Sequence, residues 1–249
     1  RVALKTIRAD IQSQTVEQRF VQEAKIIAQI AHPNVVQLYD YGFSHERGLL
    51  YLAMEYVQGV TLASLVRASS LRLPLALEVC RQVCSGLAES HALGVVHRDL
   101  KPENVMLTTT AEGAVQVKIL DFGIALSVMA ETRMTATGAI TGTPHYMSPE
   151  QAQDKDVGAE SDVYSLGVIL YELLCGQLPF KADTPLALLL KHVQQLPESI
   201  QTRVPDLPEG VAALVTQMLS KEPTSRQRSA RAVGQQIDAL RRVLALPAV

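Results

Sequence analysis

The feature that most constrains this chain is the segment SDVYSLGVILYELLCG, residues 161–176, which is apolar on nearly every side of a helix. Ser165, Gly167 and Glu172 interrupt it, and it is too short to span a bilayer. A helix that is apolar all round must be covered on every side by other elements. The segment therefore predicts a buried central helix within a large helical body.

The chain has 249 residues, and its character changes near residue 57. The expected strands are residues 1–7, 35–43, 49–57, 104–108 and 115–120, and the expected helices are residues 15–30, 74–94, 161–176 and 209–220. This pattern predicts an α+β fold of two packed lobes, with a hinge between them. The smaller, β-rich lobe is expected at residues 1–57 and the larger, mainly helical lobe at residues 58–249.

Charge and cysteine usage bear on partners and setting. The formal net charge is -2, and no long stretch of one sign indicates a nucleic-acid partner or an anionic membrane. Cys80, Cys84 and Cys175 do not form a pattern typical of secreted proteins, and the first two lie four residues apart in an expected helix, as small buried thiols often do. No basic leader with an apolar core and cleavage site occurs. These features favour a reducing, cytoplasmic setting.

Two charged residues lie in apolar surroundings near the N-terminus. Lys5 interrupts an apolar strand, and Glu23 lies three residues after Phe20 and four before Ile27, on or near the apolar face of its helix. One ion pair between strand and helix would satisfy both charges and leave the lysine donors for a phosphate. Alternatively, Glu23 extends to solvent and Lys5 merely ends a strand, since neither residue alone is specific.

The stretch VVHRDLKPENVML places three polar side chains in a loop before a strand, where a rigid scaffold commonly presents catalytic groups. These are Asp99, Lys101 and Asn104, and ILDFG then places Asp121 at the end of another strand. Aspartate and asparagine offer hard oxygen ligands to Mg²⁺, which shares its coordination shell with substrate phosphates. Asp99 remains to receive or orient a hydroxyl proton, and Lys101 can neutralise charge on the group being transferred. The set predicts phosphate chemistry.

These motifs together resemble the eukaryotic-type protein kinase domain, and most closely its bacterial serine/threonine branch. The resemblance runs from residue 2 almost to the end of the chain, and its motifs occur in the family's order. They are VALK, Glu23, HPN, MEYV, HRDLKPEN, DFG, TGTPHYMSPE, SDVYSLG and Arg226. The resemblance implies a two-lobe kinase-like fold and ATP-dependent phosphoryl transfer to proteins.

The resemblance also implies roles for the polar site residues. Asp99 would position the acceptor hydroxyl and receive its proton, and Lys101 would stabilise the γ-phosphate. Asn104 and Asp121 would hold Mg²⁺ or Mn²⁺. Lys5, paired with Glu23, would grip the α- and β-phosphates of ATP.

The segment MEYV matches the family's hinge. Met54 would be the gatekeeper, and the backbone of Glu55 and Val57 would meet the adenine edge. Ala3 and Met106 match the positions that sandwich the adenine ring. The apolar members of this set would equally suit ordinary core packing.

Other matches imply structural roles. Ile27, Leu38, Phe122 and His97 match a stacked set that links the helix of Glu23 to the catalytic loop. Asp162 matches an aspartate that anchors the backbone of that loop.

Glu150 and Arg226 match a buried ion pair that ties the end of the activation segment to the large lobe. Thr143 matches a threonine that contacts Asp99 and Lys101. With the lysine of DLKPEN, it favours serine and threonine as acceptors.

The threonine-rich segment before Pro149 implies regulation by autophosphorylation, with Thr135 and Thr137 as candidate sites. Arg98 and Arg19 would receive the added phosphate. Leu126 stands where the family commonly has another basic residue, which weakens the expected phosphate pocket. Self-association of two chains would serve such autophosphorylation.

Two other functions compete with this interpretation. One is a catalytically inactive kinase fold that acts as a scaffold, although Lys5, Asp99 and Asp121 are all present. The other is a kinase of small molecules, against which GTPHYMSPE and Arg226 argue, because they belong to the peptide-binding half of protein kinases.

In this family a glycine-rich loop on the two preceding strands covers the ATP phosphates, and no GxGxxG occurs in this sequence. The resemblance implies a truncated small lobe. We expect the chain as given to bind ATP weakly and to transfer phosphate poorly, and a version with those strands restored to be active. Bacterial relatives often carry a sensor after a linker, so the chain could be the cytoplasmic domain of a membrane-anchored kinase.

Overall fold

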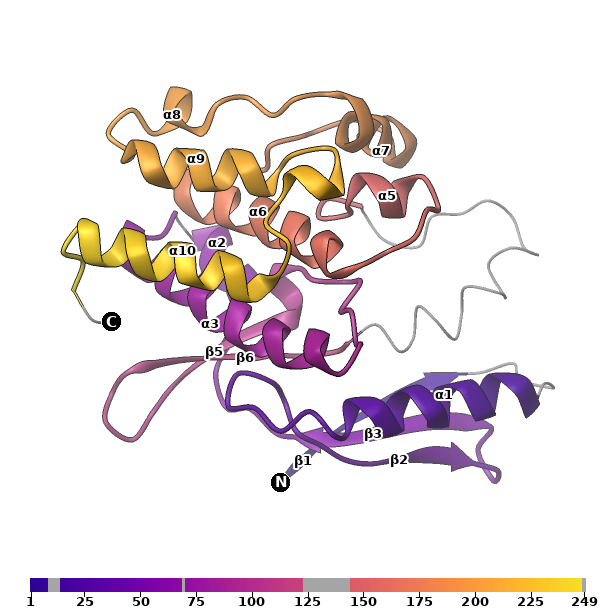
Figure 1. Cartoon of the computed structure of the whole chain (residues 1–249). Coiled ribbons are helices and arrows are strands. Elements are labelled where there is room, and N and C mark those ends of the chain that lie inside the picture. The colour runs from indigo at the N-terminus through magenta and orange to yellow at the C-terminus, as the bar shows by residue number, and fades with distance from the viewer. Residues whose placement is uncertain (9–13, 69, 123–143, 248–249) are drawn as a thin grey trace.

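A computed structural model describes residues 1–8, 14–68, 70–122 and 144–247. A small sheet with one covering helix lies against a larger helical body (Figure 1). The elements, in chain order, are β1 (Val2–Arg8), α1 (Gln14–Ile27), β2 (Leu38–Ser44), β3 (Leu49–Glu55), β4 (Val60–Thr61), α2 (Leu62–Ala68), α3 (Leu73–Ala92), η1 (Pro102–Asn104), β5 (Val105–Thr109), β6 (Val115–Ile119), α5 (Pro149–Ala152), α6 (Ala159–Cys175), α7 (Pro185–Gln194), α8 (Ile200–Arg203), α9 (Glu209–Met218), η2 (Pro223–Ser225) and α10 (Ala230–Val243).

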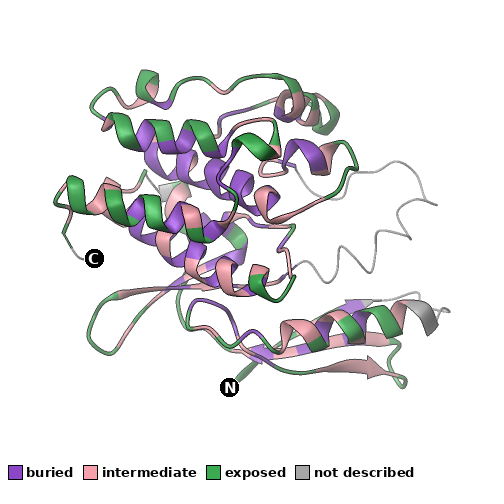
Figure 2. Cartoon of the chain, in the orientation of Figure 1, coloured by how far each residue is buried: buried purple, intermediate pink, exposed green. Residues whose placement is uncertain are grey.

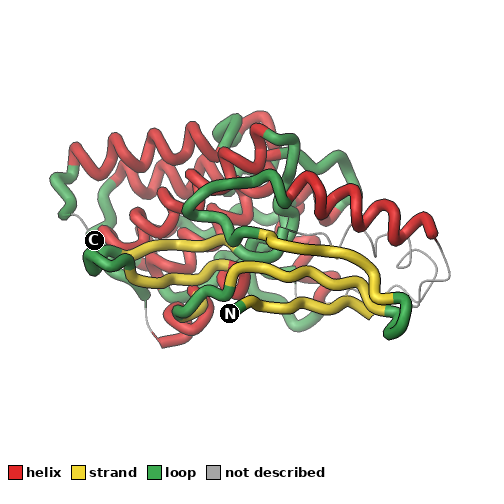
Figure 3. The backbone as a smooth tube through the Cα atoms, turned by 90° about the horizontal axis from the view of Figure 1, so that it is seen from below, coloured by secondary structure: helices red, strands yellow, loops and turns green. Residues whose placement is uncertain are grey.

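The small sheet is antiparallel with strand order β1-β3-β2, and its three strands run side by side in Figure 3. In the β1–β3 register Lys5 lies opposite Leu52. Helix α1 packs on this sheet through the fully buried Phe20 and Ala24, which share an apolar cluster with Leu50. The helix thus packs on the small sheet, closest to β2.

One predicted strand starts later than expected. Residues 35–43 were predicted to form it, but β2 begins at Leu38. Val35 instead forms an isolated parallel bridge with Ile119 and belongs to the core of the large body. The turn before β2 is therefore attached to the helical body, a long-range contact that local periodicity cannot reveal.

A second, shorter sheet has the order β4-β5-β6. Strands β5 and β6 pair antiparallel, with Val105 opposite Ile119. This hairpin follows the catalytic-loop sequence and leads directly to Asp121. It therefore joins two of the predicted site segments.

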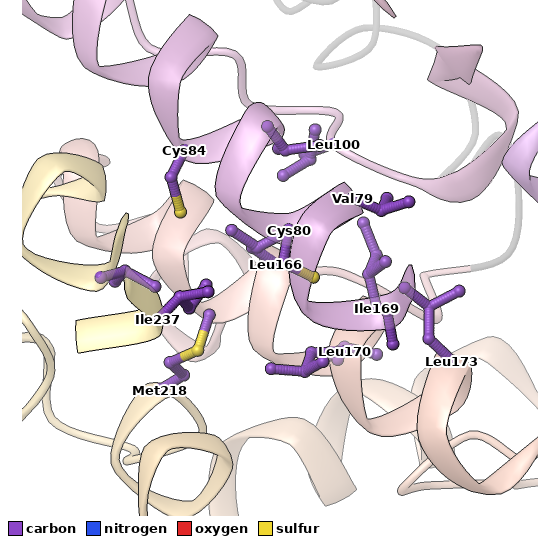
Figure 4. Packing of buried hydrophobic residues seen from close by; sticks show 14 of the residues in the cluster. Val79, Cys80, Cys84, Leu100, Leu166, Ile169, Leu170, Leu173, Met218 and Ile237 are labelled. Atoms are coloured by element: carbon purple, nitrogen blue, oxygen red, sulfur yellow. The ribbon is translucent and has the colours of Figure 1, made fainter. Parts of the chain in front are cut away.

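Helix α6 lies at the centre of the large body, as predicted. Its residues Val163, Tyr164, Leu166 and Leu170 are fully buried, and Figure 2 shows α6 and the inner face of α3 as buried. In Figure 4 side chains of these two helices interleave, with Met218 of α9 and Ile237 of α10 beside them. Helices α3, α6, α9 and α10 thus all contribute to this apolar cluster.

Gly167 explains how closely α9 approaches α6. A Cβ atom at this position would lie 2.8 Å from the Cβ of Met218 and 3.3 Å from its carbonyl carbon. Real side-chain contacts are longer than the first distance, so only glycine fits without a shift of the helices.

Among the helices of the described residues, none is long and apolar enough to cross a membrane.

Candidate active site

The catalytic loop is held in place by Asp162, in the first turn of α6. Its buried carboxylate accepts hydrogen bonds from the backbone N–H of His97 (2.8 Å) and of Arg98 (3.0 Å). His91 Nε2 lies 2.8 Å from the same carboxylate. Arg98 has a left-handed backbone, with φ of 63°, which a non-glycine residue adopts only where its surroundings enforce it. The carboxylate of Asp162 thus holds the backbone of His97 and Arg98 in place.

Asp99, Lys101 and Asn104 lie together at the end of this loop. Lys101 Nζ is 2.7 Å from Asp99 Oδ2, and Asn104 Nδ2 donates to the backbone oxygen of Asp99 at 2.8 Å and to Oδ2 at 3.2 Å. The side chains of Asp99 and Lys101 are each 36% exposed. The carboxylate is therefore oriented by the protein and still open to a substrate.

Asp121 is connected to this group through the residue before it. The backbone N–H of Leu120 donates to the carbonyl of Asn104 at 2.8 Å, and His97 Nε2 lies 2.8 Å from the carbonyl of Leu120. A carbonyl only accepts, so His97 carries its proton on Nε2. The other ring nitrogen, Nδ1, accepts from the backbone N–H of Asp99 at 3.3 Å. One buried imidazole thereby connects the segments of Asp99 and Asp121.

Lys5 forms an ion pair with Asp121. Its Nζ is 2.9 Å from Asp121 Oδ2, and the two side chains are 37% and 28% exposed. Asp121 has a left-handed backbone, with φ of 50°. Glu23 is half-buried on α1. Lys5 thus reaches the segment that directly follows β6. The pairing of Lys5 with Glu23 stays a prediction.

The residues present fit a magnesium ion. The amide nitrogen of Asn104 donates both of its hydrogen bonds to Asp99. The amide oxygen of Asn104, Oδ1, is therefore the atom that can bind a cation. Asp121 adds a partly exposed carboxylate from the adjoining segment. Amide and carboxylate oxygens are the hard ligands that Mg²⁺ prefers.

The predicted adenine hinge, residues 54–57, begins in the last two residues of β3. Met54 is buried and lies opposite Ala3 in the sheet, so both are adjacent to the hinge. The N–H of Glu55 donates to the carbonyl of Gln37 at 2.9 Å. Within the described part of the chain, neither backbone group of Val57 has a hydrogen-bond partner. The backbone of Val57 therefore has a donor and an acceptor to offer.

A contact at this hinge was not predicted. Glu55 Oε2 is 2.7 Å from Lys118 Nζ on β6, so the hinge is tied to the strand that leads to Asp121. Met106, on the neighbouring strand β5, lies opposite Lys118 and is half-buried. The roles of Met54, Ala3 and Met106 around an adenine stay predictions.

Glu150 and Arg226 form an ion pair that is almost completely enclosed. Arg226 donates from Nη1 to Oε1 at 2.7 Å and from Nη2 to Oε2 at 2.9 Å, and the two side chains are 0% and 5% exposed. Burial by itself raises the pKa of Glu150, but the hydrogen bonds from Arg226 and Ser161 outweigh it and lower that pKa. The glutamate is therefore held as a carboxylate.

The residues matched to the stacked set make a ring contact and apolar packing contacts. The rings of His97 and Phe122 lie 4.8 Å apart, and Ile27 packs against both buried clusters. Leu38 belongs to the cluster of the small sheet.

Arg98 is exposed on the catalytic loop, and so is Arg19 on α1.

The predicted threonines Thr135, Thr137 and Thr143 lie outside the described residues, as does Leu126. Sequence reasoning missed His91, which contacts Asp162, and Lys118, which pairs with Glu55. His91 lies six positions before His97, and nothing in that spacing indicates its partner on α6.

The model of the protein kinase domain family matches residues 1–236, so the chain belongs to the protein kinase family. The serine/threonine-protein kinase PknB of Mycobacterium leprae is 39% identical over 233 residues, which cover 92% of this chain and 37% of that protein. A probable serine/threonine-protein kinase of Streptomyces coelicolor is 40% identical over 235 residues, with 92% and 34% covered. The chain thus spans little more than a third of the length of these bacterial relatives.

The fold also matches solved kinase structures. The kinase domain of PknI from Mycobacterium tuberculosis superposes with a TM-score of 0.72 at 24% identity, over 96% of this chain and 84% of that one. At this identity the likeness concerns the fold alone. It agrees with the predicted small β-rich part and larger helical part.

Proposed function

We propose that this chain transfers the γ-phosphoryl group of ATP to serine and threonine hydroxyls of proteins. One observation carries the proposal: Lys5, Asp121, Asn104, Asp99 and Lys101 form one connected group from three separate segments. Each of these side chains has the chemistry that phosphoryl transfer requires. The printed names of the bacterial relatives support the same class of reaction.

Asp99 is proposed to accept the proton of the attacking hydroxyl, because its oriented carboxylate is still accessible to a substrate. Lys101, 2.7 Å from that carboxylate, neutralises negative charge on the group being transferred. Lys5 binds the phosphates of the bound nucleotide. When bound between Asn104 and Asp121, Mg²⁺ supplies positive charge to the phosphate oxygens.

The acceptor class is tested by incubating the purified chain with labelled ATP, Mg²⁺ and either a basic protein rich in serine and threonine or a panel of sugars and aminoglycosides. The proposal predicts label on phosphoserine and phosphothreonine of the protein. A scaffold would label nothing, and a small-molecule kinase would label only the panel. Either result would contradict the proposal.

We further propose that phosphorylation of the segment before Pro149 raises activity, with Thr135 and Thr137 as the sites and a second copy of the chain as the partner. A phosphothreonine adds about -1.5 to -2 charge and binds arginine. The exposed Arg98, next to Asp99, supports this role, and Arg19 is the second proposed acceptor. Full activity of the Thr135→Ala/Thr137→Ala variant after phosphatase treatment would exclude this regulation.

The proposed setting is the cytoplasm, where ATP is abundant and thiols stay reduced. Among the described residues the three cysteines are free thiols. Burial raises the pKa of Cys80 to about 12, so this thiol is protonated and unreactive at neutral pH.

A further inference from the structure

Gln82, on the buried face of α3, uses its amide in four hydrogen bonds. Oε1 accepts from Asn34 Nδ2 at 2.9 Å and from the backbone N–H of Val117 at 2.8 Å. Nε2 donates to Glu78 Oε1 at 2.8 Å and to the carbonyl of Val115 at 2.9 Å. A buried amide with this many partners has one orientation only, because a flip would place like groups against each other.

Two of these bonds hold one edge of β6. Strand β5 pairs with the other edge, and the edge near Gln82 has no neighbouring strand of its own sheet. Gln82 and Asn34 take that place, since Asn34 Nδ2 also donates to the carbonyl of Val117 at 2.8 Å and its carbonyl accepts from Ile119 at 2.8 Å. The position of β6 thus depends on these two amide side chains at Val115 and Val117, together with the backbone of residues 34–36 at Ile119.

The end of β6 determines where Asp121 lies. Ile119 is the last residue of the strand, and the N–H of Leu120 then donates to Asn104. Asp121 follows directly, and its carboxylate is the one that contacts Lys5. A shift of β6 would therefore move a predicted metal ligand relative to Asn104.

Glu78 orients the amide of Gln82. Its buried carboxylate accepts from Arg81 Nη2 at 2.6 Å and from Arg241 Nη1 of α10 at 2.5 Å. Burial by itself raises the pKa of Glu78, but hydrogen bonds from Arg81 and Gln82 outweigh it and lower that pKa. The carboxylate accepts only, so Nε2 of Gln82 faces it and Oε1 faces β6.

We propose that Gln82 is a positioning residue for Asp121: through β6 it holds this carboxylate where it can share a divalent cation with Asn104. This inference rests on the proposed function for the role of that cation. It adds a residue on α3 whose side-chain amide contacts Asn34, Glu78 and β6.

The test uses Gln82→Met, which keeps the length of the side chain and removes all four hydrogen bonds. The control is Val83→Ala, at the adjacent apolar position of α3, which is also buried. Mn²⁺ binding is titrated by electron paramagnetic resonance with a non-hydrolysable ATP analogue present. Hydrogen exchange is measured at residues 115–122 without nucleotide. Urea unfolding records the stability of each variant.

Loss of a partner outside the metal shell typically weakens metal binding by about tenfold or more, and we expect about tenfold for Gln82→Met. Exchange at residues 120–122 should become faster in the same variant. Val83→Ala should lose stability without either change. If Gln82→Met does not fold, Asn34→Ala carries the same expectation, because it removes the donor to both Gln82 and Val117.

Unchanged Mn²⁺ affinity or unchanged exchange in Gln82→Met would overturn the inference, and so would equal changes in Val83→Ala. The proposed function fails separately, if the wild-type chain binds no nucleotide or transfers no phosphate. In that case the exchange measurement still decides whether Gln82 positions the segment of Asp121.

Discussion

Two ion pairs of this protein differ mainly in burial. Glu150 and Arg226 are joined by two hydrogen bonds and are almost completely enclosed. Lys5 and Asp121 are joined by one contact and are both about a third exposed. The first pair is closed to any ligand, whereas the second lies where a ligand can reach it.

This difference separates stability from chemistry. Removing one partner of a buried pair leaves an uncompensated charge in the interior, which is costly. An exposed pair contributes little, because water and salt replace its interaction. The enclosed pair should therefore hold the large lobe together, and the open pair should be free to exchange its partner for a phosphate and a cation.

The largest expected effect is on the enclosed pair. Arg226→Met should lower the free energy of unfolding by about 3 to 5 kcal/mol, because Glu150 keeps its charge without a partner. Urea unfolding at neutral pH measures this loss.

The control is the double variant Glu150→Gln/Arg226→Met, which removes both charges. It should recover part of the lost stability, since no isolated charge remains. A loss in Arg226→Met below about 1 kcal/mol, the range of exposed pairs, would show that burial does not separate the two pairs.

A buried group without an opposite charge extends the comparison. His192 is fully buried, its Nδ1 lies 3.0 Å from the hydroxyl of Tyr164, and Nε2 has no partner among the described residues. Burial first, and then the nearby Lys221 and His145, lower its pKa to about 3. The folded protein therefore resists protonation of this ring.

The folded pKa lies below the unfolded value of 6.5, so this contribution to stability is complete above pH 6.5 and is lost as the pH falls toward 3. Between these limits the loss approaches about 1.4 kcal/mol per pH unit. His192→Phe should show a shallower fall in unfolding free energy over this range. Parallel stability profiles for the two proteins would refute the assignment.

The smallest effect on stability is expected at the open pair. Lys5→Met should change the free energy of unfolding by less than about 1 kcal/mol, because both partners are solvated. It should nevertheless raise the KM for ATP by about tenfold, the value of one hydrogen bond to a charged group. Lys25→Met, on the exposed side of α1, is the control and should change neither quantity. A large loss of stability in Lys5→Met would show that the pair of Lys5 and Asp121 stabilises the fold as the enclosed pair does, which would contradict the comparison.

The sequence predicted best what is local. The buried helix α6 followed from its apolar composition, and the group of Asp99, Lys101 and Asn104 lies within six consecutive residues. Polar side chains this close in a loop need no knowledge of the fold to be placed together. The anchor at Asp162 and the pair of Glu150 with Arg226 came from family motifs.

What the sequence did not predict depends on contacts between distant segments. The pairing of Lys5 with Asp121 needs the relative placement of β1 and the end of β6. The late start of β2 follows from the contact of Val35 with Ile119, and the four bonds of Gln82 join three segments. Periodicity within one segment carries no information on such partners.

The most direct test of the account is phosphate transfer by Asp99→Asn compared with wild type under single-turnover conditions. Asparagine can still accept from Lys101 and Asn104, so the free energy of unfolding should change by less than about 1 kcal/mol. Transfer to a serine and threonine acceptor should fall by at least about a hundredfold, because the group that receives the hydroxyl proton is lost. Transfer at the wild-type rate would contradict the account.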